Sequence, residues 1–463
     1  MSFLLPIFLF LVGFFPNPAF CENAVSSMRF ELIHSDGPEL LGTAIKPENR
    51  LKHFRELVHR DFYRKKMVSE MLGRRRRATE LSGDGNSFAM PMSSGAYART
   101  GQYFVRFQVG TPAQKFLLVA DTGSDLTWMN CRYRCRNCTN PGGRRRRVFH
   151  ADSSSSFSPV KCSSAACQRL PFSLTTCPAP ESPCAYDYRY ADGSYAKGIF
   201  ADESTTVTLS SGERVKLKGV VIGCSSSFDG SSFRAADGVL GLARSNHSFA
   251  VKATDHAGGK FSYCLVDHLS PKNASGYLSF GSATTPSDCK SAMQHTRLLL
   301  DPLLDPFYAV QVTGISVGGI LLPIPRVVWD ASSQGGVILD SGSSLTMLAE
   351  PAYRAVLSAL SAPLMAFPKV DNKPFDFCFN VSGGGYKEDL VPILAVHLDG
   401  AARFEPPVKS YVIDVADGVK CIGILSASWP AISTIGNILQ QNFLWEFDLH
   451  NGRLGFEPST CGP

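Results

Sequence analysis

The stretch FLLVADTGSDLT at residues 116–127 decides the fold, because it recurs as GVILDSGSSLT at residues 336–346. Each copy runs from an apolar segment into Asp, a hydroxyl residue, Gly and Ser, and reaches Leu-Thr after one more residue. Each copy is also followed downstream by a short segment that ends in Gly, at residues 239–241 and 434–436. The repeat predicts two lobes built on one plan, each of which presents one carboxylate.

The chain around these motifs is typical of a β protein. From residue 101 onwards, strand-like runs alternate with turns rich in Gly, Asn and Asp. Examples of these runs are GQYFVRFQVG at 101–110, GYLSFG at 276–281, FYAVQVTGISVGG at 307–319 and WEFDLHNGRLGF at 445–456. Helices are expected to be short, as at 351–360. We therefore predict an all-β body, with the boundary between the two lobes near residues 282–300.

The N-terminus is interpreted as a secretory signal peptide. Residues 2–15 form an uncharged apolar run, and Ala19-Phe20-Cys21 supplies small residues at the −3 and −1 positions of a cleavage site. A membrane anchor is the alternative, but the run is short for a membrane span, which needs about 20 residues. No later apolar run approaches that length, so we expect no membrane span in the mature chain.

Residues 47–77 show helical periodicity and are followed by Arg74–Arg77 and a stretch rich in Gly and Ser at 81–95. Helix, basic cluster and linker in that order are typical of a pro-segment joined by a cleavable hinge. A surface helix followed by a loop is the alternative. The net charge is +6, yet twelve Lys and Arg residues and only four Asp and Glu residues lie within 46–77. Because the basicity is local, the composition gives little support to nucleic-acid binding.

The fourteen cysteines of a secreted chain are expected to form disulfides. Cleavage after Cys21 would leave thirteen, so at least one thiol would be free or intermolecular. The spacing of Cys131, Cys135 and Cys138 also fits an iron–sulfur ligand set, but a secretory route favours disulfides. Asn-x-Ser/Thr triplets offer candidate glycosylation sites at Asn137, Asn246, Asn273 and Asn380.

Two carboxylates that face each other cannot both ionise easily, so one keeps a proton to higher pH. Such a pair can hold one water, and the ionised Asp accepts its proton during attack on a peptide carbonyl. The protonated Asp donates to the carbonyl oxygen. This chemistry needs neither a metal nor a cofactor, and the ten histidines show no metal-binding spacing. The Gly-Ile-Ser-Val-Gly stretch at 314–318 lacks the following helix of a serine-hydrolase elbow, so a strand and turn are expected there.

The sequence resembles the pepsin-like aspartic proteases, and in particular their plant, nepenthesin-like branch. The resemblance covers roughly residues 25–463. It is carried by DTGSDLTW, YADGS, ADGVLGLA, KFSYCLV, DSGSSLT and IGNILQQNFLWEFDLHNGRLGFEP, and by MRFELIHSD in the pro-segment. It implies a bilobal fold of two β-barrel-like lobes with the active-site cleft between them.

The resemblance also implies roles for single residues. Asp121 and Asp340 would be the catalytic pair, Tyr190 would cover substrate from a mobile hairpin (the flap), and Trp128 would steady that tyrosine. Gly123 and Gly342 would present backbone N–H groups, and Ser124 and Ser343 would hold the two aspartates by their hydroxyl groups. Ala191 departs from the glycine that is usual after the flap tyrosine. Cys378 and Cys421 would form the disulfide of the C-terminal lobe.

On this basis the chain divides into a signal peptide at 1–21, a pro-segment at 22–100, an N-terminal lobe at 101–281 and a C-terminal lobe at 282–463. A Cys-rich insert occupies 131–184, and its Arg144–Arg147 run is either an exposed loop or a second processing site. We expect a monomeric aspartic endopeptidase, made as a zymogen, that cleaves polypeptides and is inhibited by its own pro-segment. The secretory route, ending outside the cell or in the vacuole, is favoured over the chloroplast. The alternative function is an inactive pepsin-fold protein that inhibits a glycosidase.

Overall fold

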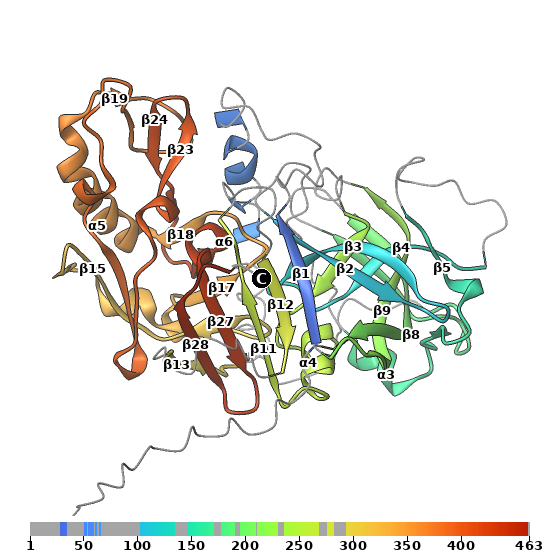
Figure 1. Cartoon of the computed structure of the whole chain (residues 1–463). Helices are drawn as coiled ribbons and strands as arrows, with labels where there is room; N and C mark the ends of the chain where they lie inside the picture. Colours follow the sequence, from blue (N-terminus) through green and yellow to red (C-terminus); the bar gives the residue numbers. More distant parts are fainter. Residues whose placement is uncertain are drawn as a thin grey trace, which may run out of the picture.

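The structure is a computed structural model of the whole chain (Figure 1). It describes residues 28–34, 51–52, 54–59, 61–62, 64–65, 102–134, 147–170, 177–189, 195–209, 211–229, 236–267, 276–281 and 293–461. Tyr190, Ala191, Arg74–Arg77, Asn137 and Asn273 lie outside these ranges, as do the signal peptide and most of the boundary region at 282–300. Within the described residues, no helix is long and apolar enough to cross a membrane.

Two lobes stand side by side in Figure 1, with the N-terminal half in cyan and green and the C-terminal half in orange and red. The strands of the first lobe are β2 (Tyr103–Val109), β3 (Gln114–Asp121), β4 (Trp128–Arg132), β5 (Phe149–His150), β6 (Ser158–Pro159), β7 (Ala185–Arg189), β8 (Tyr195–Thr208), β9 (Arg214–Asp229) and β10 (Gly238–Gly241). Its helices are η3 (Ala151–Ser153), α3 (Ala165–Arg169) and α4 (Phe249–Thr254).

The second lobe contains two small four-stranded sheets and, among the described residues from 102 onwards, the longest helix, α5 (Glu350–Ser361). Its strands are β14 (Tyr308–Val310), β15 (Val312–Val317), β16 (Ile320–Leu321), β17 (Val337–Asp340), β18 (Thr346–Ala349), β19 (Lys369–Val370), β20 (Cys378–Asn380), β21 (Leu394–Leu398), β22 (Arg403–Phe404), β23 (Val412–Ala416), β24 (Val419–Ile422), β25 (Ile424–Ala427) and β26 (Ser433–Gly436). Its other helices are η5 (Arg326–Trp329), η6 (Ala331–Ser333), η7 (Ala362–Ala366), η8 (Glu388–Leu390), η9 (Asp399–Ala401), η10 (Val408–Ser410) and α6 (Asn437–Gln440). The helix predicted at 351–360 is confirmed by α5, and the Gly-x-Ser-x-Gly stretch lies in β15 and the following turn.

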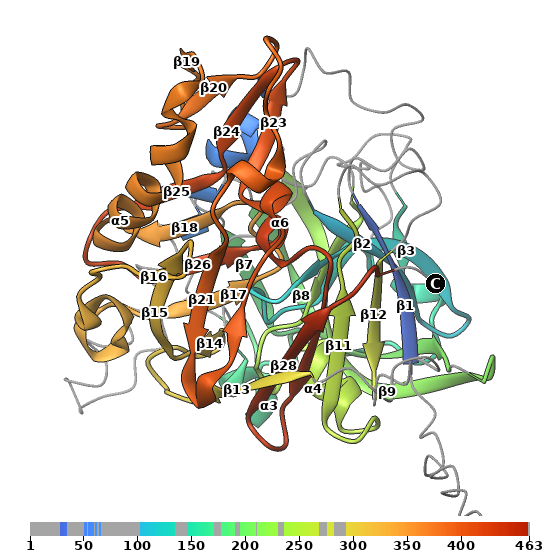
Figure 2. The ribbon, with the colours of Figure 1, turned by 60° about the vertical axis from the view of Figure 1, so that its left-hand side comes forward.

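A continuous sheet joins the two lobes (Figure 2). It is completed by β1 (Met28–His34), β11 (Lys260–Cys264), β12 (Gly276–Phe280), β13 (Gln294–Leu299), β27 (Phe443–Asp448) and β28 (Arg453–Pro458). Antiparallel pairing runs in the order β2, β1, β12, β11, β27, β28 and β13. Where the halves meet, the rings of Phe261 and Phe447 stack with centroids 4.6 Å apart. Large aromatic side chains such as these contribute strongly to the apolar contact between the two halves.

Strand β1 comes from the predicted pro-segment, yet it lies inside this joining sheet. Met28, Phe30 and Leu32 alternate with exposed residues and are buried in the main core. Phe30 makes edge-to-face contacts with Phe249 and with Phe280, each at 6.0 Å. A strand with one apolar face is expected to pack that face against a hydrophobic core. The start of the predicted pro-segment is therefore an integral part of the fold.

Strands β3 and β17 carry the two repeated motifs, and their last four residues, 118–121 and 337–340, are buried on both faces, which explains the apolar residues that precede each Asp. Each of these strands pairs in parallel with a later strand. In the first lobe Asp121 of β3 lies opposite Gly241 of β10, and in the second lobe Asp340 of β17 lies opposite Gly436 of β26. The segments that echo each other in the sequence thus occupy equivalent places in the two lobes.

Candidate active site

Asp121 and Asp340 end strands β3 and β17, and neither side chain is exposed to solvent. The turn after each strand reaches back to its carboxylate. The amide of Gly123 donates to Oδ1 of Asp121, and the amide of Gly342 donates to Oδ1 of Asp340, both at 2.9 Å. The two carboxylates therefore have matching backbone donors, as the motif repeat implies.

A serine hydroxyl completes each carboxylate cradle. Ser124 Oγ donates to Oδ2 of Asp121, and Ser343 Oγ donates to Oδ2 of Asp340 at 2.7 Å. The hydroxyl of Ser and the backbone N–H both favour the ionised form of a carboxyl group. Each aspartate is held by two donors from its own lobe, so its orientation does not depend on the other lobe.

The two turns are fastened to each other by hydroxyl groups at the residue after each aspartate. The amide of Thr122 donates to Ser341 Oγ at 3.0 Å, and the amide of Ser341 donates to Thr122 Oγ1 at 2.9 Å. Ser341 Oγ in turn donates to the carbonyl of Ala120 at 3.0 Å. This reciprocal pair was not predicted, although the hydroxyl residue shared by Asp-Thr-Gly and Asp-Ser-Gly was a signal for it.

The glycine in each motif allows the opposite carboxylate to approach. A Cβ placed on Gly342 would overlap Oδ1 of Asp121, and one placed on Gly123 would lie 2.9 Å from Oδ1 of Asp340. Any side chain at these positions would push the two turns apart. The structure thus brings both predicted aspartates face to face, each with its predicted glycine and serine.

A cation from the predicted pro-segment lies between the two aspartates. Arg64 Nη2 donates to Oδ1 of Asp121 and to Oδ1 of Asp340, each at 2.6 Å, and Nη1 donates to Oδ2 of Asp121 at 3.2 Å. Its Nε donates to Oδ2 of Asp340, so the guanidinium contacts all four carboxylate oxygens. Burial disfavours the charge on Arg64, but the two carboxylates outweigh this effect and raise the pKa of the guanidinium above its ordinary value. Arg64 is therefore cationic at every pH at which the protein is folded.

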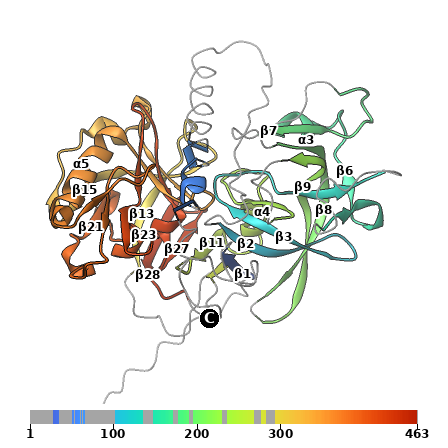
Figure 3. The same ribbon diagram turned by 90° about the horizontal axis from the view of Figure 1, so that it is seen from above.

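The helix that carries Arg64 packs on the second lobe. Residues 51–52, 54–59, 61–62 and 64–65 are helical and lie between the lobes when the molecule is viewed from above (Figure 3). Phe54, Leu57 and Val58 are buried in an apolar cluster with residues of the second lobe, and the Phe54 and Phe375 rings meet edge to face at 6.0 Å. On the exposed side, Arg55 Nε donates to the carbonyl of Lys373 at 2.8 Å.

Asp61 connects this helix to the motif of the second lobe. Its Oδ2 accepts hydrogen bonds from the amides of Ser344 at 3.0 Å and Leu345 at 2.7 Å. These amides directly follow Ser343 in the second Asp-Ser-Gly-Ser motif. Asp61 and Arg64 were not predicted as site residues, because nothing local distinguishes them from the other charged residues of the basic helix.

Lys65 follows Arg64 and is also buried, with 7% of its surface exposed. Among the described residues, no acceptor lies within hydrogen-bonding distance of its Nζ. Burial lowers the pKa of Lys65 to about 7, because a low-dielectric environment disfavours the ammonium form. Among the described buried residues of this helix, the guanidinium of Arg64 is therefore paired with carboxylates, whereas the amine of Lys65 has no hydrogen-bond acceptor.

Trp128 begins β4 and is 1% exposed, with its ring 5.7 Å from that of Phe228. Its predicted partner Tyr190 lies outside the described residues, so the flap contact stays a prediction. Of the candidate glycosylation sites, Asn246 is exposed and Asn380 is half-buried. Both positions are accessible enough to remain candidates.

Five disulfides are present among the described residues, and one of them joins Cys378 to Cys421. The others join Cys131 to Cys224, Cys162 to Cys177, Cys167 to Cys184, and Cys264 to Cys461. Because Cys131 is in a disulfide, it is not an iron–sulfur ligand. The described residues contain no group of three His, Cys, Asp or Glu side chains that could hold a metal ion.

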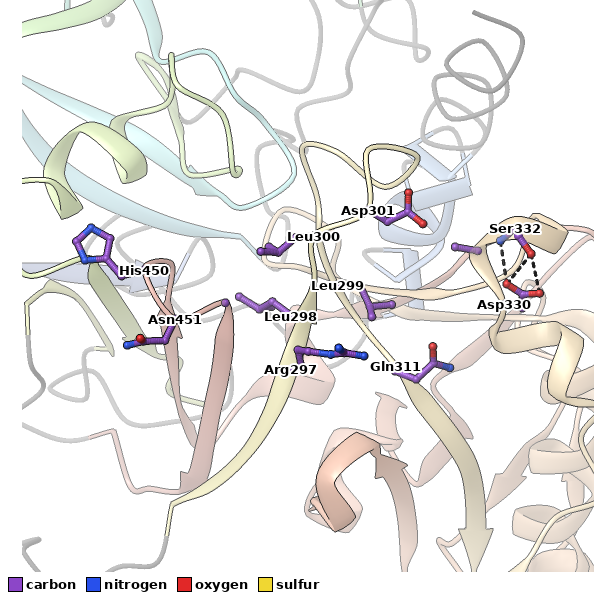
Figure 4. Close-up of a pocket in the computed structure, with 12 residues that line it drawn as sticks. Arg297, Leu298, Leu299, Leu300, Asp301, Gln311, Asp330, Ser332, His450 and Asn451 are labelled. Carbon is purple, nitrogen blue, oxygen red and sulfur yellow. Dashed lines mark hydrogen bonds between the residues drawn. The ribbon is translucent and has the colours of Figure 1, made fainter. Parts of the chain in front are cut away.

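A separate pocket of about 550 Å³ opens beside β13, and neither aspartate motif lines it (Figure 4). Ser332 on its wall donates to Asp330 from both its amide, at 2.9 Å, and its hydroxyl, at 2.8 Å. These bonds cap the short helix η6 (Ala331–Ser333), so they have a structural explanation. The pocket lacks a pair of facing carboxylates, and the candidate active site remains the aspartate pair.

Comparison with known proteins shows which families have a similar sequence. Residues 103–282 match the family model described as xylanase inhibitor N-terminal, and residues 307–458 match the model described as xylanase inhibitor C-terminal. The chain is 35% identical to "Aspartyl protease family protein 2" of Arabidopsis thaliana over 81% of this chain and 74% of that protein. It is 32% identical to "Aspartic proteinase nepenthesin-1" of Nepenthes gracilis over 80% of each chain.

Solved structures with the same fold are more distant in sequence. The crystal structure of basic 7S globulin from soybean matches with a TM-score of 0.61 and 19% identity, over 79% of this chain and 93% of that one. The crystal structure of edgp matches with a TM-score of 0.63 and 19% identity, over 81% of this chain and 97% of that one. These matches, together with the strand content, confirm the predicted bilobal, all-β fold.

Proposed function

Because this chain belongs to the plant, nepenthesin-like branch of the pepsin-type aspartic proteases and is an aspartic endopeptidase, we propose that Asp121 and Asp340 are its catalytic pair. The observation that carries this proposal is the symmetry of the site. Two buried carboxylates from the two lobes face each other, and each accepts a backbone N–H and a serine hydroxyl from its own motif. Polypeptides are the substrates that suit such a pair.

The proposed mechanism follows from the coupling of the two carboxylates. As in aspartic proteases generally, one member of the pair is ionised and the other is protonated, because two negative charges that face each other repel. The ionised Asp accepts a proton from a water held between them, and the oxygen of that water attacks the peptide carbonyl carbon. The protonated Asp donates to the carbonyl oxygen, so charge does not accumulate in the buried site. Tyr190, with Trp128 behind it, would close over the substrate.

We further propose that the precursor is a zymogen whose pro-segment extends from residue 22 to residue 100. Arg64 occupies the position between the carboxylates that the attacking water needs. Helix residues Phe54, Leu57 and Val58 anchor it on the second lobe. The signal peptide at 1–21 and the lobe boundaries at 281 and 282 belong to the same proposal. The helix that carries Arg64 is then an intramolecular inhibitor that must leave the cleft before a substrate can bind.

Acid would release this inhibitor through the carboxylates. Arg64 keeps its charge throughout, so its own deprotonation cannot open the site. Protonation of Asp121, Asp340 or Asp61 removes the negative charge that holds the helix. We therefore expect proteolysis to appear in acid.

The test is cleavage of a denatured protein by the purified precursor between about pH 3 and pH 8, with and without pepstatin. We expect turnover that is greatest in acid and blocked by pepstatin, an inhibitor directed at aspartate pairs. Absence of turnover at every pH, even after removal of the pro-segment, would contradict the catalytic assignment. It would favour the second candidate, an inactive protein that binds a glycosidase, which the description of the two matching family models suggests.

The secretory route remains our proposal for localisation, with the extracellular space or the vacuole as its end and the chloroplast as the alternative. The five disulfides support a route through an oxidising compartment. A monomer is also proposed.

Lys65 provides a test of the docked helix. In the released segment Lys65 has its ordinary pKa of 10.5, whereas in the docked segment the pKa is about 7. Between these values release takes up a proton, so docking weakens as the pH falls from 10.5 to 7 and stays weakened below 7. Lys65→Met removes this penalty, and we expect acid conversion of the precursor to be at least about tenfold slower, the equivalent of one pKa unit.

The exposed Lys52 of the same helix is the matched control. Lys52→Met precursor is expected to convert at the wild-type rate, measured by gel at one acidic pH. Equal rates for the two variants would show that the buried amine of Lys65 does not weaken docking.

A further inference from the structure

Tyr308 lies on β14, the strand beside the one that carries the second aspartate. Strand β14 pairs antiparallel with β17, and Tyr308 lies opposite Leu339, the residue before Asp340. Tyr308 is 1% exposed, and its ring centroid lies 4.6 Å from that of Phe447 and 5.6 Å from that of Phe261. Its main chain is therefore fixed beside Asp340, and its ring is fixed where the two halves of the molecule meet.

The hydroxyl of Tyr308 reaches the first lobe. It donates to the carbonyl of Leu242 at 2.7 Å. Burial raises the pKa of this phenol above its ordinary value, and the nearby charge of Arg244 lowers it by less, so the hydroxyl stays protonated and can donate. Leu242 follows Gly241, which lies opposite Asp121, and the amide of Leu242 donates to the carbonyl of Asp121 at 2.9 Å. Two hydrogen bonds thus connect Tyr308 to the main chain of the first aspartate.

Two further contacts join the same segments of the two lobes. The amide of Arg244 donates to the carbonyl of Pro306 at 2.8 Å. The guanidinium of Arg244 also forms an ion pair with Asp305. Residues 305–308 of the second lobe are therefore fastened to residues 242–244 of the first lobe, next to the strand ends that carry the aspartates.

Tyr263 shows the same arrangement in the opposite direction. It lies on β11, is 2% exposed, and its hydroxyl donates to Oε1 of Gln440 in α6. Nε2 of Gln440 donates to the carbonyl of Ile435 at 2.7 Å. Ile435 precedes Gly436, which lies opposite Asp340. One tyrosine from each half of the chain thus supports the segment that pairs with the aspartate strand of the other half.

The separation of two facing carboxylates determines how strongly they interact. Repulsion between two negative charges falls as the distance between them grows. Strong interaction separates the two apparent pKa values of such a pair, and weaker interaction brings these values together. The reciprocal bonds of Thr122 and Ser341 join the turns after the aspartates, whereas Tyr308 joins the strands before them. Both connections are needed to hold the carboxylates at one distance.

We propose that Tyr308 is a positioning residue, whose hydroxyl helps to fix the separation of Asp121 and Asp340 by holding Leu242. This inference rests on the proposed role of these aspartates as the catalytic pair. Tyr308 is buried and acts through the main chain of Leu242. Loss of its hydroxyl leaves the glycine and serine donors of each aspartate in place, but it removes one connection between the two aspartate strands.

The test uses full-length precursor of the wild type, Tyr308→Phe, Tyr411→Phe and Asp121→Asn, each converted in acid, with active enzyme counted by pepstatin titration. Tyr411 is the matched control, because it is a buried tyrosine of the second lobe whose hydroxyl donates to the carbonyl of Pro392 at 3.0 Å. Each Phe variant therefore loses a hydroxyl that donates to a backbone carbonyl, and each keeps its ring. Both variants should fold, with similar losses of thermal stability.

We expect kcat of Tyr308→Phe to fall about fivefold, which corresponds to the net value of one neutral hydrogen bond. KM should stay within about twofold of the wild type, because the binding surface is unchanged. The bell-shaped profile of kcat/KM against pH should become narrower by about half a pH unit, with its acidic limb moved up and its alkaline limb moved down. Tyr263→Phe should narrow the profile in the same way, whereas Tyr411→Phe should match the wild type in kcat and in profile.

A Tyr308→Phe enzyme with the kcat and the pH profile of Tyr411→Phe would overturn the inference, even if it has lost thermal stability. Movement of both limbs in one direction would also contradict it, because that result indicates a changed charge rather than a changed separation. Absence of activity in the wild type, or activity that Asp121→Asn retains, would instead overturn the proposed function and this inference with it.

Discussion

Replacement of either Asp121 or Asp340 with Asn is expected to abolish peptide hydrolysis, with a loss of at least about a thousandfold in kcat. Each carboxylate has a separate task in the proposed mechanism, one as proton acceptor and one as donor, and an amide can do neither. Asn keeps the shape of Asp and can still face the glycine amide and the serine hydroxyl of its motif. The variants should therefore fold and be secreted, and loss of activity should not reflect loss of structure. Cleavage of a denatured protein in acid, per mole of folded chain, measures the effect.

Asp417→Asn is a suitable control, because Asp417 is exposed in the turn between β23 and β24. It should retain full activity. Substantial hydrolysis by Asp121→Asn or by Asp340→Asn would refute the assignment of the pair. The double variant should be no less active than the single variants, because residues that act as a unit are not additive.

Replacement of Arg64 with Ala is expected to make the uncut precursor active. In the docked state Arg64 is the cation that neutralises two buried carboxylates, and its removal leaves both charges uncompensated. Breaking a buried ion pair by removing one partner costs about 3–5 kcal/mol, so docking should weaken by roughly a hundredfold or more. The precursor should then hydrolyse a peptide at mildly acidic pH without the lag of the wild type. Arg64→Lys should retain part of the latency, because an ammonium lacks the planar fork that reaches four oxygens.

This experiment needs precursor that stays intact. Arg74–Arg77 would therefore be replaced with alanine in every variant, so that the basic cluster is not cleaved. A gel run after the assay would verify that the chain is still full length. Arg55→Ala is the matched control, because Arg55 lies on the same helix but is exposed and donates to Lys373 of the second lobe. It should remain latent. An Arg64→Ala precursor that is as inactive as the Arg55→Ala precursor would show that the helix blocks the cleft without help from the ion pairs.

The features predicted correctly from the sequence are those that depend on short, contiguous sequence patterns. Two apolar runs that end in Asp-Thr-Gly-Ser and Asp-Ser-Gly-Ser predict two equivalent strand ends, and β3 and β17 have this form. Alternating and apolar runs predict the all-β body, which the strand content and the structural matches confirm. The helix of the predicted pro-segment follows from its periodicity in the same way, as far as residues 51–65 are described.

Features that depend on contacts between distant segments could not be predicted. Arg64 is one of twelve basic residues between 46 and 77, and only docking on the second lobe selects it. The partners of Cys131 and Cys264 lie far away along the chain, and spacing alone does not define such pairs. The hydroxyl of Tyr186 lies 2.6 Å from Ser225 Oγ, and only the fold brings these two residues together.

The placement of β1 makes the inhibitory helix a tethered ligand. Residues 28–34 are held by backbone pairing and a buried apolar face, whereas Arg64 is held by ion pairs with Asp121 and Asp340. Residues 35–50 join the two anchors and span at most about 55 Å when fully extended. A helix that leaves the cleft thus stays at an effective concentration on the order of 1 mM, whatever the dilution of the protein. A cut after Arg77 leaves that tether in place, and only a second cut within 35–50 converts the helix into a free peptide. The number of cuts then decides whether opening of the cleft is reversible.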